Sequence, residues 1–244
     1  MTNMNGSAPP ILEMRDVSSA YGPFRAIFDV TFTVPDGSAV ALLGPNGAGK
    51  STVARACTGL VPIGSGRLLF EGNDVTGLPA HKLARMGIAH APEGRSVFSS
   101  LSVEENLTLT FRQALGKKGM QAALDRAYSA FPRLGERRKQ NAGTLSGGEQ
   151  RMLSLAKVLA NPPKLLVVDE LSLGLAPIIV DEVFRILADI RSAGTSLLVV
   201  EQHVGRALAL ADRAVLLNQG SVMHEGPVDQ LGDLVDKLLP GAPA

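Results

Sequence analysis

The chain has 244 residues, of which 45% are hydrophobic and 19% charged, and its 24 basic and 23 acidic side chains give a net charge of +1. This composition is typical of a globular protein with one large or two small domains, and the near-zero charge argues against a nucleic-acid-binding protein. A single cysteine excludes an intrachain disulfide. The N-terminus lacks the features of a secretory signal, and no apolar run approaches the roughly 20 residues of a membrane span, so we expect a soluble, cytoplasmic domain.

The pattern of the N-terminal half of the sequence predicts strands first and helices after them. Short segments of alternating polarity at 11–15 and 30–34 predict antiparallel strands. The apolar segment 37–43 predicts a strand that runs into a glycine-rich loop, and 50–58 predicts the helix that follows it. Residues from about 95 to 160 are mostly helical in pattern, so we expect them to form an inserted helical subdomain.

The C-terminal half alternates strands with helices. Residues 164–169 and 195–201 are continuous apolar runs, which suit a parallel sheet covered on both faces. Helices are predicted at 179–192 and 205–211. The expected fold class is therefore α/β, with an N-terminal antiparallel β subdomain and an inserted helical subdomain. The expected bounds are one domain over 10–238, with flexible tails at 1–9 and 239–244.

Residues 44–51 match the phosphate-binding pattern G-x-x-x-x-G-K-[ST] at every fixed position. A loop nearly free of side chains presents backbone N–H groups to phosphate, and the helix that follows adds its positive dipole end. Lys50 supplies a charge for the β and γ oxygens, and the Ser51 hydroxyl suits Mg²⁺. The candidate nucleotide-binding residues here are Gly44, Pro45, Asn46, Gly47, Ala48, Gly49, Lys50, Ser51 and Thr52.

Two acidic residues, Asp169 and Glu170, follow the second buried strand. In open α/β sheets, ligands bind at the carboxyl ends of the strands. Successive strand residues point to opposite faces, so the two carboxylates cannot perform the same task. We expect Asp169 to hold Mg²⁺ and Glu170 to activate water as a catalytic base.

The segment 145–150 (Leu-Ser-Gly-Gly-Glu-Gln) opens a helix, in which Ser146 and Glu149 predict a capping box. Gly147 and Gly148 weaken the start of this helix without an obvious structural gain. They are expected if a phosphate must approach that backbone closely.

With both motifs, the chain resembles the ATP-binding-cassette (ABC) ATPases over nearly its whole length, and 145–150 matches their signature motif without a mismatch. The resemblance implies a P-loop NTPase core and a head-to-tail dimer, in which this motif closes over ATP bound by the second subunit. It places Tyr21 where an aromatic ring stacks on adenine, with a half-buried strand tyrosine as the alternative. It also makes 172–175 a loop that communicates between the two sites. The implied signature residues are Leu145, Ser146, Gly147, Gly148, Glu149 and Gln150.

The chain departs from the family pattern at two places. Residues 91–95 contain Glu93 where the family usually has a glutamine, and this makes Glu93 a candidate Mg²⁺ ligand beside Ser51 and Asp169. Where the family has a histidine at the γ-phosphate, counting back from 211–213 reaches Gln202. The adjacent His203 is one residue out of register, so we assign the catalytic contact to Gln202 and keep His203 as the alternative.

These departures, with 97–98, 172–179 and 200–202, resemble the shorter ATPase of branched-chain (hydrophobic) amino acid importers. Leu171 replaces the proline that is common there. The resemblance implies ATP and Mg²⁺ as cofactors, and a second ATPase subunit that is either identical or a paralogue. It also implies permease subunits in the membrane, an indirect solute-binding protein and a location on the cytoplasmic face of the membrane.

Three other functions are compatible with parts of the pattern. Urea and other amide importers use similar cassettes, and no residue here reports on the solute. Chromosome and DNA-repair ATPases share the signature, but they insert a long coiled coil between residues equivalent to 51 and 145, and this chain has no sustained heptads there. Ribosome-acting translation factors normally carry two cassettes in one chain, whereas this sequence holds one.

Overall fold

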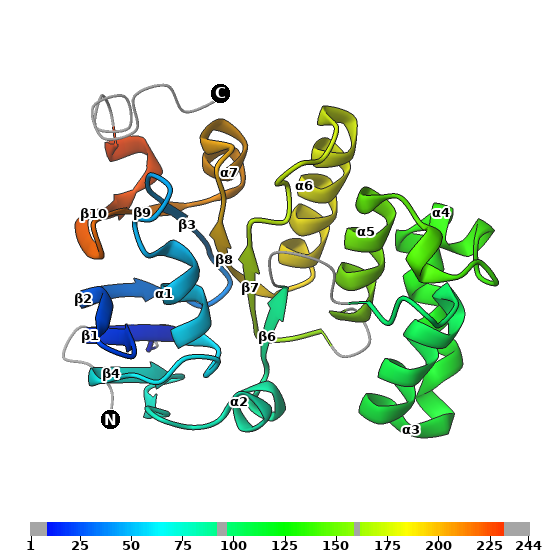
Figure 1. Ribbon diagram of the computed structural model, residues 1–244, viewed down its shortest axis with the longest axis horizontal. Helices are drawn as coiled ribbons and strands as arrows, with labels where there is room; N and C mark the ends of the chain where they lie inside the picture. Colours follow the sequence, from blue (N-terminus) through cyan, green and yellow to red (C-terminus); the bar gives the residue numbers. More distant parts are fainter. Residues whose placement is uncertain (1–8, 92–96, 159–161, 232–244) are drawn as a thin grey trace. The chain divides into compact units, whose positions relative to one another are not determined.

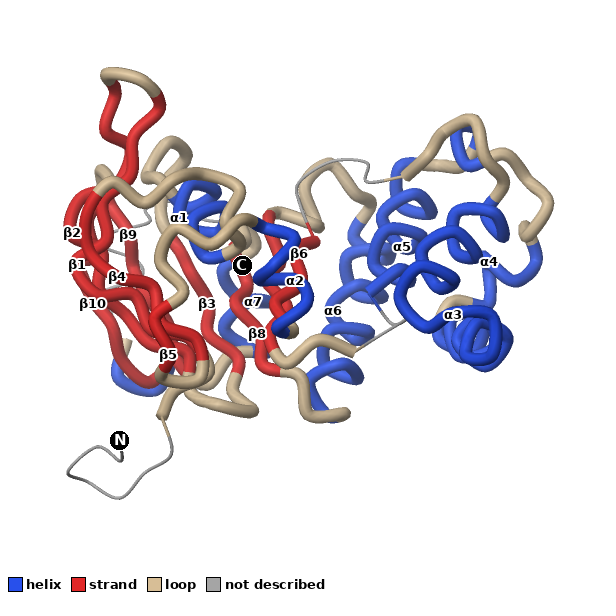
Figure 2. The backbone as a smooth tube through the Cα atoms, turned by 90° about the horizontal axis from the view of Figure 1, so that it is seen from below, coloured by secondary structure: helices blue, strands red, loops and turns tan. Residues whose placement is uncertain are grey.

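The computed structural model describes residues 9–91, 97–158 and 162–231. Glu93 lies outside these residues, as do nearly all of the two expected tails. Contacts group the chain into two compact units, which are described one at a time below. Strands gather in the first unit and helices dominate the second (Figure 2).

The first unit combines residues 1–90, 164–170 and 188–244 and contains a six-stranded sheet in the order β10-β9-β3-β8-β7-β6. β3 pairs in parallel with β8 and β9, β7 pairs in parallel with β8, and β10 returns antiparallel to β9. The predicted buried parallel strands are thereby confirmed. The strands are β3 (Ala39–Leu43), β6 (Ile88–Ala91), β7 (Leu165–Asp169), β8 (Ser196–Val200), β9 (Arg213–Asn218) and β10 (Ser221–Pro227).

A second sheet of this unit is antiparallel, in the order β2-β1-β4-β5. Its strands are longer than the predicted 11–15 and 30–34, because they continue into one hairpin. Asp16 and Asp29 adopt positive φ angles of 50° and 46°, and the pairing register shifts beside them. These irregularities interrupt the alternation of polarity. The strands are β1 (Leu12–Tyr21), β2 (Phe24–Val34), β4 (Ser65–Phe70) and β5 (Asn73–Asp74).

Helix α1 (Lys50–Cys57) contacts β1 and β2 of the antiparallel sheet and also β7 and β8 of the larger sheet (Figure 1). Alternate residues of β3 show the resulting layers. Val40 and Leu42 join the cluster that includes α1, whereas Ala41 and Leu43 face the cluster that includes α7 (Val204–Leu210). The sheet that contains β3 is therefore covered on both faces, by α1 on one and by α7 on the other. Two short elements complete the described part of this unit: α2 (Ala80–Met86) and η2 (Val228–Gln230).

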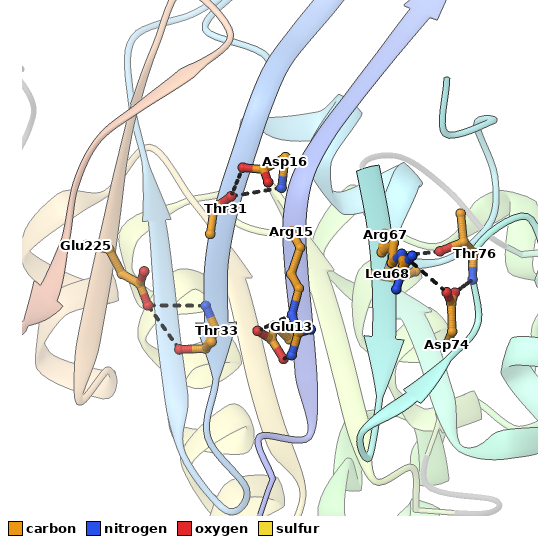
Figure 3. A network of polar contacts seen from close by, with 10 residues as sticks. All are labelled: Glu13, Arg15, Asp16, Thr31, Thr33, Arg67, Leu68, Asp74, Thr76 and Glu225. Atoms are coloured by element: carbon orange, nitrogen blue, oxygen red, sulfur yellow. Dashed lines mark hydrogen bonds and ion pairs between the residues drawn. The ribbon is translucent and has the colours of Figure 1, made fainter. Parts of the chain in front are cut away.

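Polar contacts join the outer strands of the first unit (Figure 3). One carboxylate oxygen of Glu225 on β10 accepts from the Thr33 backbone N–H at 3.1 Å and from its hydroxyl at 3.0 Å on β2. The Thr31 hydroxyl accepts from the Asp16 N–H at 2.8 Å, beside the irregularity in β1. The two sheets are thus linked at their edges as well as through α1.

The second unit combines residues 91–163 and 171–187, so it extends beyond the expected 95–160. Its longest helix begins with a Ser102–Glu105 capping box and is interrupted at Gly116, where φ is 67°. Among the described residues, no helix is both long enough and apolar enough to cross a bilayer. The elements are α3 (Val103–Ala130), α4 (Pro132–Glu136), η1 (Ala142–Thr144), α5 (Gly147–Val158) and α6 (Pro177–Ser192), which ends in the first unit.

Candidate nucleotide-binding site

The phosphate loop leaves β3 and enters α1 at Lys50, as predicted. Gly49 caps the helix with φ at 99°, and a Cβ added there would lie 2.8 Å from the Ala26 carbonyl oxygen. Both facts require glycine. The Lys50 ammonium donates to the carbonyl oxygens of Gly44 at 2.9 Å and Pro45 at 3.2 Å, so the lysine lies folded back over its own loop.

The Lys50 ammonium group is buried and is surrounded by carboxylates. Only 4% of the Lys50 side chain is exposed, and burial lowers the pKa of the ammonium group. Three nearby carboxylates oppose this shift by raising the pKa: Glu170, which has the largest effect, Asp169 and Glu201. The Oε1 atom of Glu170 lies 3.8 Å from Lys50 Nζ. Sequence reasoning did not assign a role to Glu201, which is 1% exposed and directly follows β8. An apolar strand that ends in an acid, the pattern that identified Asp169, was its available signal.

The predicted metal ligands of the first unit lie together. The Ser51 hydroxyl donates to Asp169 Oδ1 at 3.0 Å. A hydroxyl and a carboxylate oxygen at this spacing are the hard oxygen donors that Mg²⁺ prefers, so the donor set fits this ion. Among the described residues, no cluster of three or more His, Cys, Asp or Glu side chains could hold a metal by itself. Mg²⁺ is usually coordinated by one or two protein groups together with phosphate and water.

Glu170 is held in an unusual conformation. Its φ is 48°, which is uncommon for a residue other than glycine, and its N–H donates to the Val200 carbonyl at 2.9 Å. The Gln202 amide donates through Nε2 to Glu170 Oε2 at 2.9 Å. His203, the alternative to Gln202, precedes α7 as its N-cap residue without a side-chain capping bond. The two assigned catalytic side chains, Glu170 and Gln202, are therefore in direct contact.

A cavity of about 420 Å³ lies over the loop. Four of its lining residues were not predicted, and they come from β2 and from the turn after β9. Tyr21 is not among the lining residues; it is 44% exposed, and Arg55 donates to its hydroxyl at 3.5 Å. The cavity is lined by Arg25, Ala26, Phe28, Asn46, Gly47, Gly49, Lys50, Ser51, Thr52, Glu170 and Gln219.

The signature segment lies in the second unit and starts α5. The capping box is confirmed, since the Ser146 N–H donates to Glu149 Oε2 at 2.9 Å and the Glu149 N–H donates to Ser146 Oγ at 3.3 Å. Glu149 also pairs with Arg137 at 3.0 Å. The buried Gln150 amide donates to the carbonyls of Ala142 at 2.9 Å and Leu145 at 3.2 Å. Glu149 and Gln150 thus brace the segment from within.

The two signature glycines differ. A Cβ at Gly148 would lie 2.9 Å from Ile179 Cγ2, so the expectation that both glycines bring no structural gain is wrong for Gly148. Its absent side chain lets α5 pack closely against the start of α6. A Cβ at Gly147 would meet nothing within 4 Å, so this packing argument does not apply to it. In the same unit, Arg151 donates to the Leu173 carbonyl at 2.7 Å and ties α5 to the 172–175 loop.

A phosphate loop at the carboxyl edge of a parallel sheet, with acids at the carboxyl ends of β7 and β8 in the same sheet, defines a P-loop nucleotide-binding protein. A family profile described as "ABC transporter" matches residues 27–172. The chain is 45% identical over 221 residues to the high-affinity branched-chain amino acid transport ATP-binding protein BraG of Pseudomonas aeruginosa, covering 88% of this chain and 92% of BraG. The chain therefore belongs to the ABC transporter family, as an ATPase of the ATP-binding-cassette class.

Two further comparisons agree with this assignment. The chain is 36% identical over 219 residues to the probable branched-chain amino acid transport ATP-binding protein LivF of Archaeoglobus fulgidus, covering 88% of this chain and 91% of LivF. The solved ADP conformation of MJ1267, an ATP-binding cassette of an ABC transporter, matches with a TM-score of 0.81 at 24% identity. That match covers 94% of this chain and 97% of the cassette, and it supports the fold.

Proposed function

We propose that this chain is the ATP-hydrolysing subunit of an importer for branched-chain (hydrophobic) amino acids. Hydrolysis is supported above all by the contact of Glu170 with both Lys50 and Gln202 beside the phosphate loop. The transported class is supported by the similarity to BraG and LivF, which are named for branched-chain amino acid transport.

Each residue of the site has a defined task in this proposal. The phosphates bind the loop N–H groups, and Lys50 exchanges its bonds to the Gly44 and Pro45 carbonyls for bonds to the β and γ oxygens. Mg²⁺, when bound by Ser51 and Asp169, neutralises phosphate charge. Tyr21, which is exposed at the end of the β1–β2 hairpin, stacks on the adenine ring.

Glu170 accepts a proton from the attacking water, and Gln202 holds its carboxylate in position in the nucleotide-free chain. In this assignment, the Gln202 amide donates to Glu170 before nucleotide binds and to the γ-phosphate afterwards. An amide can donate a hydrogen bond but carries no charge, so Gln202 serves to orient the reacting groups. The positive φ of Glu170 sets its carboxylate apart from that of Asp169, which fits the separate roles of base and metal ligand.

The signature segment completes the site of a second subunit in this proposal. Ser146 and Gly147 are exposed at the N-terminal end of α5, where a phosphate meets backbone N–H groups. The second subunit is another copy of this chain or a paralogue. The pair docks on permease subunits at the cytoplasmic face of the membrane, and a solute-binding protein delivers the amino acid to those subunits.

The decisive experiment replaces the proposed base. Glu170→Gln should bind ATP with near-normal affinity while turnover falls about 10²- to 10⁴-fold, as expected when a general base is lost. Glu136→Gln is the matched control, because Glu136 is an exposed acid on α4 and is not one of the nucleotide-binding residues. This variant should hydrolyse ATP at the normal rate. Unchanged turnover in Glu170→Gln would refute the assignment.

Uptake separates the proposed substrate from the alternative. The chain is purified with its co-purifying membrane subunits and solute-binding protein, and the complex is placed in vesicles. ATP-dependent accumulation of labelled leucine, which Glu170→Gln abolishes, is the expected result. Accumulation of labelled urea without leucine would assign the complex to the amide importers instead.

A further inference from the structure

The hairpin of the antiparallel sheet contributes a cation to the nucleotide cavity. Arg25 lies on β2 and lines the cavity together with residues of the phosphate loop. Its guanidinium lies over the Phe28 ring, 4.9 Å from the centroid, and its Nη2 donates to the Ser18 hydroxyl at 3.0 Å. The side chain is therefore fixed by two contacts, although it is exposed on the cavity side.

The charge of Arg25 has no counterion in the part of the chain that the structure describes. No carboxylate there lies within ion-pair distance of it. Asp29 is held by the same Ser18 hydroxyl, which donates to Asp29 Oδ1 at 3.0 Å, but Asp29 forms no ion pair with Arg25. An oriented guanidinium without a counterion, facing a cavity, is suited to bind an anionic oxygen.

The Phe28 ring beneath Arg25 is itself held by contacts with a neighbouring turn. The Phe28 N–H donates to the Gly220 carbonyl at 2.8 Å, and a Cβ on Gly220 would lie 2.7 Å from the Phe28 ring. Phe28 thus packs directly on the turn that joins β9 to β10. A cation held over a ring packed in this way loses little conformational freedom when a ligand binds.

The lining residues also indicate which part of the nucleotide meets Arg25. Glu170 lines the cavity from the end of β7, and Arg25 lines it from β2, with α1 in contact with both strands. A nucleotide whose γ-phosphate lies at Glu170 must extend its α-phosphate away from β7, toward β2. We propose that Arg25 binds the α-phosphate and strengthens the binding of ATP and ADP equally; this rests on the nucleotide site of the proposed function.

The test compares ligands that differ in phosphate. Arg25→Gln should weaken the binding of ATP and the binding of ADP by the same factor. We expect about tenfold at low salt, the effect of losing a charged hydrogen bond at an exposed site. Adenosine, measured by competition against a fluorescent ADP analogue, should bind as before. The maximal hydrolysis rate should be retained while KM rises, because the contact is equal in ground and transition states. Arg25→Lys should recover part of the affinity.

Arg67→Gln is the matched control, since Arg67 is on β4, pairs with Asp74 at 4.0 Å and does not line the cavity. Its affinities should equal those of the wild type. A loss confined to ATP would place Arg25 at the γ-phosphate, and an equal loss for adenosine would place it at the nucleoside; either result overturns the proposal. Normal binding by Arg25→Gln refutes this inference alone, whereas a wild-type chain that binds no nucleotide refutes the proposed function.

Discussion

Gln202 donates to Glu170 at 2.9 Å, so a neutral amide positions the carboxylate that we propose as the base. Gln202→Ala should slow ATP hydrolysis roughly ten- to a hundredfold. This factor corresponds to the loss of about 1.5–3 kcal/mol, the usual contribution of a hydrogen bond to a charged group. Gln202→His should keep much of the activity, because the related cassettes use histidine there. His203→Ala should have a mild effect, and steady-state rates at saturating ATP measure all three variants.

The pH dependence of the rate provides an independent check. A histidine at the γ-phosphate would give the rate a titration near its ordinary pKa of about 6.5, whereas glutamine gives none. Gln202→His should therefore gain such a titration. An inactive His203→Ala beside an active Gln202→Ala would reverse the assignment and make His203 the phosphate contact.

His90 makes stability depend on pH. Burial lowers the pKa of its imidazole to about 4, and the nearby Arg55 adds to this effect. Between pH 6.5 and 4 the unfolded chain therefore binds a proton that the folded chain does not. The contribution of His90 to stability should therefore be complete above pH 6.5 and be lost as the pH falls toward 4, by roughly 3 kcal/mol at most. His90→Gln should flatten this decline in denaturant midpoints measured across that range.

The exposed His81 supplies the control, because His81→Gln should leave the decline unchanged. The comparison concerns the slope with pH, so a general loss of stability in His90→Gln does not obscure it. A slope equal to that of the wild type would show that His90 already titrates normally in the folded chain.

At the scale of single elements, the start of α5 allows packing and function to be separated. Gly148→Ala should destabilise the chain by about 1–3 kcal/mol, because its methyl group would meet Ile179. Gly147→Ala meets no such neighbour and should be neutral or stabilising by up to about 1 kcal/mol through helix propensity. We nevertheless expect Gly147→Ala to hydrolyse ATP poorly, since its methyl group would occupy the surface offered to the second subunit's nucleotide.

Thermal melts and ATPase rates on the same preparations test this pair. A stable Gly147→Ala chain with normal hydrolysis would remove that glycine from the functional surface. A Gly148→Ala chain with unchanged stability would show that α5 and α6 adjust at no cost.

Elements built on local patterns were predictable from the sequence. The phosphate loop with α1, the Ser146–Glu149 capping box and the apolar strands β7 and β8 each depend on residues close together in the chain. The β1–β2 hairpin was predicted only in part. Its positive-φ residues Asp16 and Asp29 break the alternation by which strands are recognised.

The site shows the same division. Motifs identified Lys50, Asp169 and Glu170, whereas Arg25 and Phe28 enter the cavity only because α1 packs against β2. No local pattern marks these two residues. The contact between Gly148 and Ile179 joins residues 31 positions apart and likewise required the tertiary structure.

At the scale of the whole molecule, we predict composite sites shared between two subunits. A Ser146→Arg chain and a Lys50→Ala chain should each be inactive alone, because the first lacks a signature surface and the second lacks a phosphate-binding lysine. Mixed together, they should form some hybrid dimers with one intact composite site and recover part of the ATPase activity. Titration of one variant into the other measures this recovery.

Cooperativity gives the second measurement, because tightly coupled sites can require both to be intact. Hydrolysis by the native chain should rise with a Hill coefficient above 1 as ATP increases. Inactive hybrids together with hyperbolic ATP dependence would argue against shared sites.

The burial of α1 between two sheets has a further consequence for the single cysteine. Cys57 lies at the end of this helix with no exposed surface, its sulfur is 3.6 Å from that of Met14, and burial raises the pKa of its thiol to about 12. An alkylating reagent can therefore reach this thiol only when α1 separates from β1. The rate of labelling should therefore report how often the layers open, and a nucleotide bound at the other end of α1 should slow it in proportion to its occupancy.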